Sequence, residues 1–181
     1  RGGPLEQGYA WGAVRQLLEP LLMTADDAER TRLTAGAAAL AAPALHQAGT
    51  EVDDQATMHG LYWLVVNLAD TAPVVLIVDD LQWVDVVSLR WLSYLVRRAH
   101  DLPLLVALST RPDHASAEAD ALADDPLTHH LRPRPLTVGA VAALTTEALG
   151  AAPEPPFTEE IARVTGGNPF YVGALLGEAR D

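Results

Sequence analysis

Hydrophobic residues recur at helical spacing through the first part of the chain. Over 9–23 the apolar side chains fall at i, i+3, i+4, i+7 and i+8, which predicts one face of an amphipathic helix: Val14, Leu17, Leu18, Leu21 and Leu22. The alanine-rich segment 26–42 predicts a second helix. Segment 55–69 predicts a third, with one apolar stripe: Leu61, Leu64, Val65 and Leu68. The stretch 48–54 between them predicts a loop.

Two short apolar runs, 74–78 and 104–108, each follow a proline and contain no polar residue. Such runs are typical of central parallel strands that are buried on both faces. Between them, Asp85 is predicted to cap a helix that continues to about Arg98. A strand, a helix and a second strand in this order indicate a parallel crossover unit, and hence an α/β fold.

The pattern changes in the last third of the chain. Segment 131–136 is a weaker strand candidate, followed by a helix that Thr137 caps and that ends near Leu149. After the proline-rich stretch 153–156, Thr158 is predicted to cap a short helix ending at Gly166, and Asn168 and Pro169 to open the last helix. We therefore predict an α/β domain over 1–152 and the start of a small helical subdomain over 153–181.

Composition excludes several classes of function. The 181 residues carry a net charge of −12, which argues against nucleic-acid binding, because contacts to phosphate groups need clustered basic side chains. Cysteine is absent, so disulfides and thiolate metal sites are excluded. All 12 basic residues are arginine, so chemistry that needs lysine is excluded too. With no membrane-spanning run and no signal-peptide pattern, we expect a soluble cytoplasmic protein.

An acidic pair, Asp79 and Asp80, directly follows the first predicted strand. Open α/β sheets bind ligands beyond the carboxyl ends of their strands, and carboxylates there hold Mg²⁺ in nucleotide hydrolases. The alternative is that the pair only forms a turn or begins a helix. Adjacent carboxylates repel one another unless a cation is near, which favours the functional interpretation.

From this pair onward the chain resembles a known family. The segment 74–104, VVLIVDDLQWVDVVSLRWLSYLVRRAHDLPL, is similar to the Walker B segment and following helix in the ATPase domain of large LuxR-type transcriptional regulators, which are STAND-type relatives of the AAA+ proteins. Three further motifs occur in the family's order, and the resemblance covers nearly the whole chain: WGAVRQLLEPL at 11–21, TRP at 110–112 and GNPF at 167–170.

The resemblance implies a P-loop NTPase-type three-layer sheet, truncated here, with the start of a helical lid. It implies that Asp79 binds Mg²⁺ and that Asp80 positions the attacking water. Thr110 and Arg111 match the strand end where the family senses the γ-phosphate, and Pro169 matches a proline that packs near the base. Implied cofactors are ATP and Mg²⁺, and DNA would be bound only through a helix-turn-helix outside this sequence.

The chain departs from the family where the phosphate loop belongs. A loop of the form G-x-x-x-x-G-K-[ST] needs a lysine, and this sequence contains none. The resemblance implies that the first strand, this loop, its helix and most of the second strand precede Arg1. We therefore expect that the chain alone neither hydrolyses ATP nor binds it tightly. By the same resemblance the missing first strand would lie between segments 104–110 and 131–136, so we also expect the chain to self-associate through the edges of these two segments.

Other residues carry weaker predictions. Arg111 is either a phosphate sensor or a partner of Asp113 or Asp79. Trp83 and Asp85 are more simply explained by packing and helix capping than by catalysis. The adjacent histidines 129 and 130 point apart and lack a carboxylate at ligand spacing, so a surface turn is favoured over a metal site.

Three functions remain open at this point. The first is the ATP-binding regulatory domain of a transcriptional regulator. The second is a non-catalytic interaction module that keeps the α/β shell. The third is a receiver-like phosphoacceptor, which the acidic pair resembles. The third is weakened because the next strand ends in Ser-Thr-Arg and the lysine that a receiver needs is absent.

Overall fold

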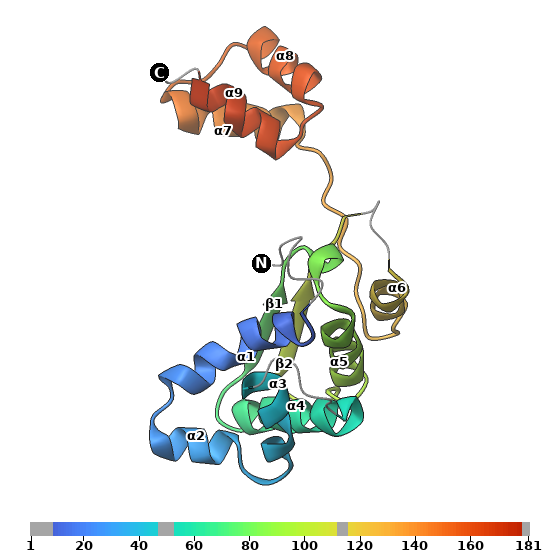
Figure 1. The fold of residues 1–181 in the computed structure, drawn as a ribbon. Coiled ribbons are helices and arrows are strands. Elements are labelled where there is room, and N and C mark those ends of the chain that lie inside the picture. The colour runs from blue at the N-terminus through green and yellow to red at the C-terminus, as the bar shows by residue number, and fades with distance from the viewer. Residues whose placement is uncertain (1–8, 47–52, 112–115, 179–181) are drawn as a thin grey trace. The chain divides into compact units, whose positions relative to one another are not determined.

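The computed structural model describes residues 9–46, 53–111 and 116–178. The chain forms two compact units, one ending at His129 and the other beginning at His130 (Figure 1). Within the described ranges, the first unit holds both strands and most of the helices, and the second holds helices only. The domain boundary expected after residue 152 falls inside the second unit.

The first unit begins with α1, Gly12–Thr24. Val14, Leu18 and Leu22 are buried, as the helical spacing predicts, whereas Leu21 is exposed because it lies beyond the edge of the buried stripe. The single helix expected over 26–42 is wrong. The structure has α2 (Asp27–Leu33), a 3₁₀ segment η1 (Gly36–Ala41) and α3 (Ala42–His46). The break falls at Gly36, whose φ of 62° lies in the left-handed region that helices exclude.

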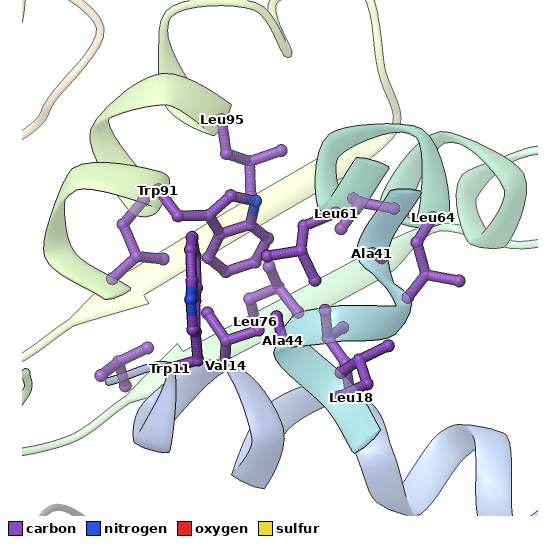
Figure 2. Packing of buried hydrophobic residues seen from close by; sticks show 14 of the residues in the cluster. Trp11, Val14, Leu18, Ala41, Ala44, Leu61, Leu64, Leu76, Trp91 and Leu95 are labelled. Atoms are coloured by element: carbon purple, nitrogen blue, oxygen red, sulfur yellow. The ribbon is translucent and has the colours of Figure 1, made fainter. Parts of the chain in front are cut away.

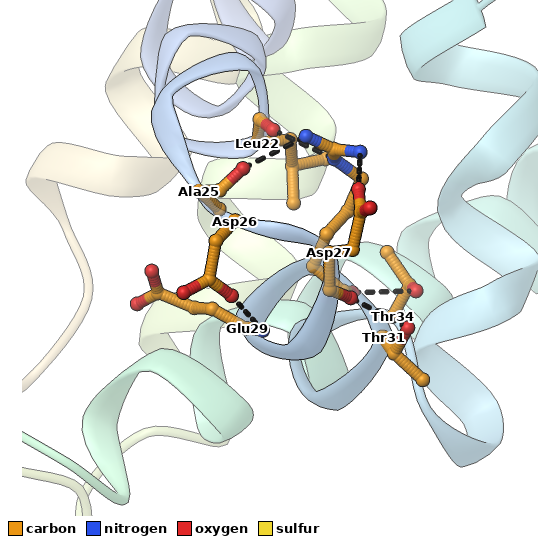
Figure 3. A network of polar contacts seen from close by, with 8 residues as sticks. Leu22, Ala25, Asp26, Asp27, Glu29, Thr31 and Thr34 are labelled. Carbon is orange, nitrogen blue, oxygen red and sulfur yellow. Dashed lines mark hydrogen bonds and ion pairs between the residues drawn. The ribbon is translucent and has the colours of Figure 1, made fainter.

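Arg30 of α2 hydrogen-bonds to three residues at the junction between α1 and α2, namely Leu22, Ala25 and Asp27, which are labelled in Figure 3. Its guanidinium donates to the carbonyl of Leu22 at 3.0 Å and to that of Ala25 at 2.8 Å, which satisfies carbonyls at the end of α1. It also donates to the Asp27 carboxylate at 3.0 Å. One side chain therefore fixes the angle at which α2 leaves α1.

Helix α4, Asp54–Ala69, starts at Asp53, whose carboxylate accepts from the backbone N–H groups of Gln55 and Ala56. The predicted stripe of α4 is buried except for its last member, Leu68, which is partly buried. Gly60 lies against η1 so closely that a β-carbon there would come within 2.3 Å of the Ala41 nitrogen. Only glycine permits this crossing. The loop expected over 48–54 lies mostly outside the described residues.

The sheet consists of two parallel strands, β1 (Val74–Val78) and β2 (Leu104–Leu108). Val74 pairs with Leu104, and the register continues to Val78 and Leu108. Both strands lie where the apolar runs predict them, and they pair in parallel with a helix between them along the chain. The described part of the chain contains no third strand.

The two faces of this sheet differ. Leu76 and Val78 turn toward the helices and are buried. On the opposite face Val75, Ile77 and Leu105 are 56%, 67% and 60% exposed. The expectation that both faces are buried is therefore wrong, because no described helix packs on the second face.

The core of the first unit lies between the sheet and helices α1, α4 and α5 (Val86–Val96) (Figure 2). Trp11 and Trp91 both belong to this core, together with Val14, Leu61 and Leu95. Trp91 is fully buried, and its indole Nε1 has no hydrogen-bond partner among the described residues. Burying a side chain of this size contributes on the order of 3 kcal/mol or more, enough to offset the unsatisfied indole donor.

Helix α6, Ala117–Ala123, packs on α5 and completes the first unit. Ser116 caps it by accepting from Ala119 N–H at 3.1 Å. After the helix, the Asp125 carboxylate lies 3.6 Å from the Arg97 guanidinium at the end of α5.

The second unit contains α7 (Val138–Leu149), α8 (Pro155–Thr165) and α9 (Pro169–Glu178). Thr137 caps α7 as predicted. The cap predicted at Thr158 is wrong: α8 begins one turn earlier at Pro155, a residue that favours the first helical position, and Glu154 is its N-cap. The core of the unit is small and apolar: Val141, Ile161, Val172 and Leu176.

The strand expected over 131–136 is also wrong. Pro133 and Pro135 lack the N–H groups that a strand ladder needs. The N–H of Leu136 donates to the Gly167 carbonyl at 2.7 Å, so this segment is fixed to the loop before α9. Gly167 has a φ of 71°, and a β-carbon there would meet the Leu136 carbonyl oxygen at 2.4 Å.

Among the described residues, no helix is both long enough and apolar enough to cross a bilayer.

Candidate functional site

The turn that follows β1 brings the acidic pair beside the end of β2. Asp80 has φ 58° and ψ 55°, a left-handed conformation that aspartate tolerates better than most residues. Its N–H donates to the Ser109 hydroxyl at 3.0 Å, and the next N–H, of Leu81, donates to the Ser109 carbonyl at 2.8 Å. Ser109 thus holds the turn by both its side chain and its backbone.

Asp79 is held by the same serine. The Ser109 hydroxyl donates to Asp79 Oδ1 while its oxygen accepts from the Asp80 N–H. The hydroxyl therefore couples both acidic residues across the two strand ends. Asp79 is half-buried, so its carboxylate retains access to solvent.

The Asp80 carboxylate points toward Gln82 and Arg111. Its Oδ1 accepts from the Gln82 amide at 2.7 Å and lies 3.8 Å from Nε of Arg111. The Gln82 amide oxygen in turn accepts from the Arg111 backbone N–H at 3.3 Å. The sequence offered Asp79 and Asp113 as partners of Arg111. In the structure Arg111 pairs with Asp80, the neighbour of Asp79, and Asp113 lies outside the described residues.

An open pocket of about 200 Å³ adjoins Asp79. Its walls come from α1, from the end of β1 and from the turn that follows: Ala13, Gln16, Leu17, Ile77, Val78, Asp79 and Val84. Most of this lining is apolar, with polar groups at Gln16 and Asp79. The pocket is smaller than the roughly 300 Å³ at which small-molecule sites begin, so it fits only part of a nucleotide.

Asp85 has the structural role that capping predicts, and more. Its side chain accepts from Ser88 N–H at 2.9 Å, which caps α5. It also accepts from the N–H groups of Trp11 at 3.0 Å and Ala13 at 3.2 Å, which caps the start of α1. Trp11 has a φ of 65°, a conformation that a bulky residue adopts only when its surroundings hold it there. Asp85 is 4% exposed and is not available to a ligand.

The oxygen atoms of Asp79 and Ser109 at the turn could fill part of the coordination shell of a magnesium ion. Mg²⁺ is commonly held by one or two carboxylates, with waters and substrate phosphates completing an octahedron. Asp79 is partly buried but reaches solvent, and it lies beside the Ser109 hydroxyl, so its carboxylate fits one ligand position. No group of three or more acidic or histidine side chains that could hold a metal occurs in the described ranges. The chain therefore offers a partial shell.

The remaining predicted residues are more dispersed. Thr110 is exposed beside Ser109 at the end of β2. Pro169 opens α9 in the second unit, and Asn168 caps that helix by accepting from Phe170 N–H at 3.0 Å. His129 and His130 are exposed.

Sequence reasoning missed the two residues that organise the turn. Gln82 follows the acidic pair within the segment that resembles Walker B, and Ser109 directly follows the second predicted strand, but the sequence pattern assigns neither of them a role. The parallel register is the observation that would have identified them. Because Val78 pairs with Leu108, the residues that directly follow the two strands are neighbours.

No family model matches this chain, and no curated protein and no solved structure is similar to it.

Proposed function

We propose that this chain is part of an ATP-binding regulatory domain of a larger transcriptional regulator. The observation that carries the proposal is the group formed by Asp79, Asp80, Ser109 and Arg111 at adjacent ends of parallel strands. Carboxylates, a hydroxyl and a guanidinium at this edge are the groups that bind magnesium and phosphate oxygens.

Each residue has a role in the proposed site. Asp79 supplies a ligand to Mg²⁺, directly or through water. Arg111 lies 3.8 Å from Asp80, a long and exposed ion pair that a phosphate is able to replace. Asp80, released from Arg111, then orients water. When bound, Mg²⁺ neutralises charge on the phosphate oxygens.

The finer fold belongs to the same proposal. A three-layer P-loop architecture needs another helical layer on the face formed by Val75, Ile77 and Leu105, which is bare among the described residues. A lysine-bearing phosphate loop would come from a longer protein, and by the resemblance α7–α9 would correspond to the start of the family's helical lid and Pro169 to its base-packing proline. This chain on its own would then bind Mg·ATP weakly.

A non-catalytic interaction module is the second candidate. The Gln82 amide and the Arg111 guanidinium already accompany the Asp80 carboxylate, so the turn is a self-contained network that needs no ligand. This function predicts that no form of the protein responds to nucleotide.

Isothermal titration of Mg·ATP distinguishes the two. The titration is run on this chain and on a longer form that includes a phosphate loop, each with and without Asp79→Ala. We expect binding by the longer form only, and its loss in the variant. An unchanged affinity of the variant, or no binding by either form, would exclude the ATP-site proposal and leave the interaction module.

A further inference from the structure

The outer edge of β1 carries unpaired backbone groups. Val74 N–H donates to the Pro103 carbonyl and the Val78 carbonyl accepts from Ser109 N–H, so the backbone of alternate residues 74, 76 and 78 points to β2. In a strand the N–H and C=O groups of the intervening residues point the other way. The backbone groups of Val75 and Ile77 therefore face the free edge, and no described residue bonds to them.

This edge lacks the features that usually protect an edge strand. Natural sheets block such edges with charged residues, prolines or bulges. β1 and β2 contain no charged residue and no proline, and their pairing is continuous from Val74 to Val78. The side chains of Ile77 and Val75 are 67% and 56% exposed, and Ile77 also lines the open pocket that α1 borders.

We infer that a second copy of this chain pairs with β1 along this edge, antiparallel and about a twofold axis at Leu76. Only an extended strand satisfies a row of backbone donors and acceptors, and β1 itself is self-complementary in this register. Val75 of one copy lies opposite Ile77 of the other, and each such pair exchanges both of its backbone hydrogen bonds.

The register also suits the side chains. Val75 and Ile77 lie on the same exposed face, so each becomes the cross-strand neighbour of its counterpart and part of their apolar surface leaves water. β2 is the poorer edge, because its outer N–H at Leu104 already donates to the Leu102 carbonyl at 2.7 Å.

Charge favours the antiparallel arrangement. Asp79 and Asp80 follow β1, and a parallel pairing in register would place the acidic pairs of the two copies side by side. The antiparallel pairing about Leu76 puts Asp79 of one copy opposite Pro73 of the other. Each copy still carries a net charge of −12, so added salt is expected to strengthen the dimer by screening.

In a competing arrangement, the exposed face of the sheet packs against the same face of another copy. The test must distinguish this arrangement from edge pairing. Face burial of this kind involves only about three large side chains per copy, Val75, Ile77 and Leu105, whereas stable interfaces use about 20–30 residues a side. Edge pairing buries a similarly small area, so its advantage over face burial is the set of backbone hydrogen bonds that it adds, and the expected dimer is weak and reversible. The inference does not depend on the proposed nucleotide site.

Sedimentation equilibrium of the 181-residue chain over a concentration series, at low and high salt, tests the pairing. We expect a reversible monomer–dimer equilibrium. Val75→Pro removes an edge N–H that β2 does not use, in both copies at once, and is expected to weaken the dimer by about tenfold or more. Leu105→Lys changes the face and not the β1 edge, so it is expected to weaken the dimer by less than about threefold.

Val164→Lys, on an exposed position of α8, is the matched surface control and should leave the equilibrium unchanged. Circular dichroism checks that each variant is folded. If Val75→Pro does not fold, Ile77→Lys replaces it in the test. This variant places a charge opposite Val75 of the other copy and is also expected to weaken the dimer by about tenfold or more. A monomer at every concentration and salt, or a dimer abolished by Leu105→Lys and kept by the edge variant, would overturn the inference.

Discussion

Three aspartates lie within seven positions of one another, and their surroundings differ. Asp85 is 4% exposed, and all its described partners are backbone N–H groups, at the starts of two helices. Asp79 and Asp80 are half-buried, and their described partners are mainly side chains from the end of β2. A carboxylate whose oxygens are filled by backbone stabilises the fold, whereas one held by exchangeable side chains is open to a ligand.

The largest effect is expected at Asp85. Asp85→Ala removes the acceptor for the N–H groups of Trp11, Ala13 and Ser88 in a dry environment, which we expect to lower the free energy of unfolding by roughly 2–4 kcal/mol. Urea unfolding followed by circular dichroism measures this. A loss below about 0.5 kcal/mol would show that the two helix starts do not depend on this side chain.

A smaller effect is expected at Ser109. Ser109→Ala removes the hydroxyl that links Asp79 to the Asp80 N–H, but the side chain is exposed and water replaces it. We expect a loss of about 0.5–1 kcal/mol in the same unfolding assay. Thr110→Ala, also exposed and adjacent, is the control and should have no effect. A loss as large as that of Asp85→Ala would remove the distinction between the two regions.

A still smaller effect is expected at Arg111. Its guanidinium lies 3.8 Å from Asp80 and is largely exposed, so Arg111→Gln should change the free energy of unfolding by less than about 0.5 kcal/mol. In a form that binds Mg·ATP, the same variant should weaken binding clearly. A variant that is destabilised but binds normally would identify Arg111 as structural.

The smallest effect is expected at a fully exposed carboxylate, Glu160 on α8. Arg163 donates to it, with Nε at 2.8 Å from Oε2, and this hydrogen bond lowers the pKa of the Glu160 carboxyl from its ordinary value. A lowered pKa adds stability at pH values above the unfolded pKa, and this is lost as the pH falls through the folded pKa. Arg163→Gln should therefore raise the pKa of Glu160 in an NMR titration. An unchanged value would show that the pair does not persist in solution.

In the first unit, the sequence predicts the positions of the helices and strands better than it predicts which of their faces are buried. Periodicity places α1, α4 and α5, and the apolar runs place β1 and β2, because local spacing records which side chains meet the core. The same runs predict burial on both faces, which is wrong, since a strand's composition does not say whether a second layer is present.

Failures elsewhere have local causes that the pattern alone does not reveal. The helix over 26–42 breaks at Gly36, and segment 131–136 bonds to Gly167 in place of a sheet. At the site, Asp79, Asp80, Thr110 and Arg111 come to adjacent strand ends as parallel pairing predicts. The double capping by Asp85 joins residues 74 positions apart in the chain, which single-sequence spacing does not encode.

The central claim is that Asp85 stabilises the fold whereas Asp79 is open to a ligand. Two isosteric changes, Asp79→Asn and Asp85→Asn, test it most directly in a longer form that binds Mg·ATP. Unfolding free energy and Mg·ATP affinity are measured on both. We expect Asp79→Asn to lose binding while its stability falls by less than about 1 kcal/mol. Asp85→Asn should lose more stability and, where folded, retain binding. Full Mg·ATP affinity in Asp79→Asn, or equal losses of stability in the two variants, would contradict the account.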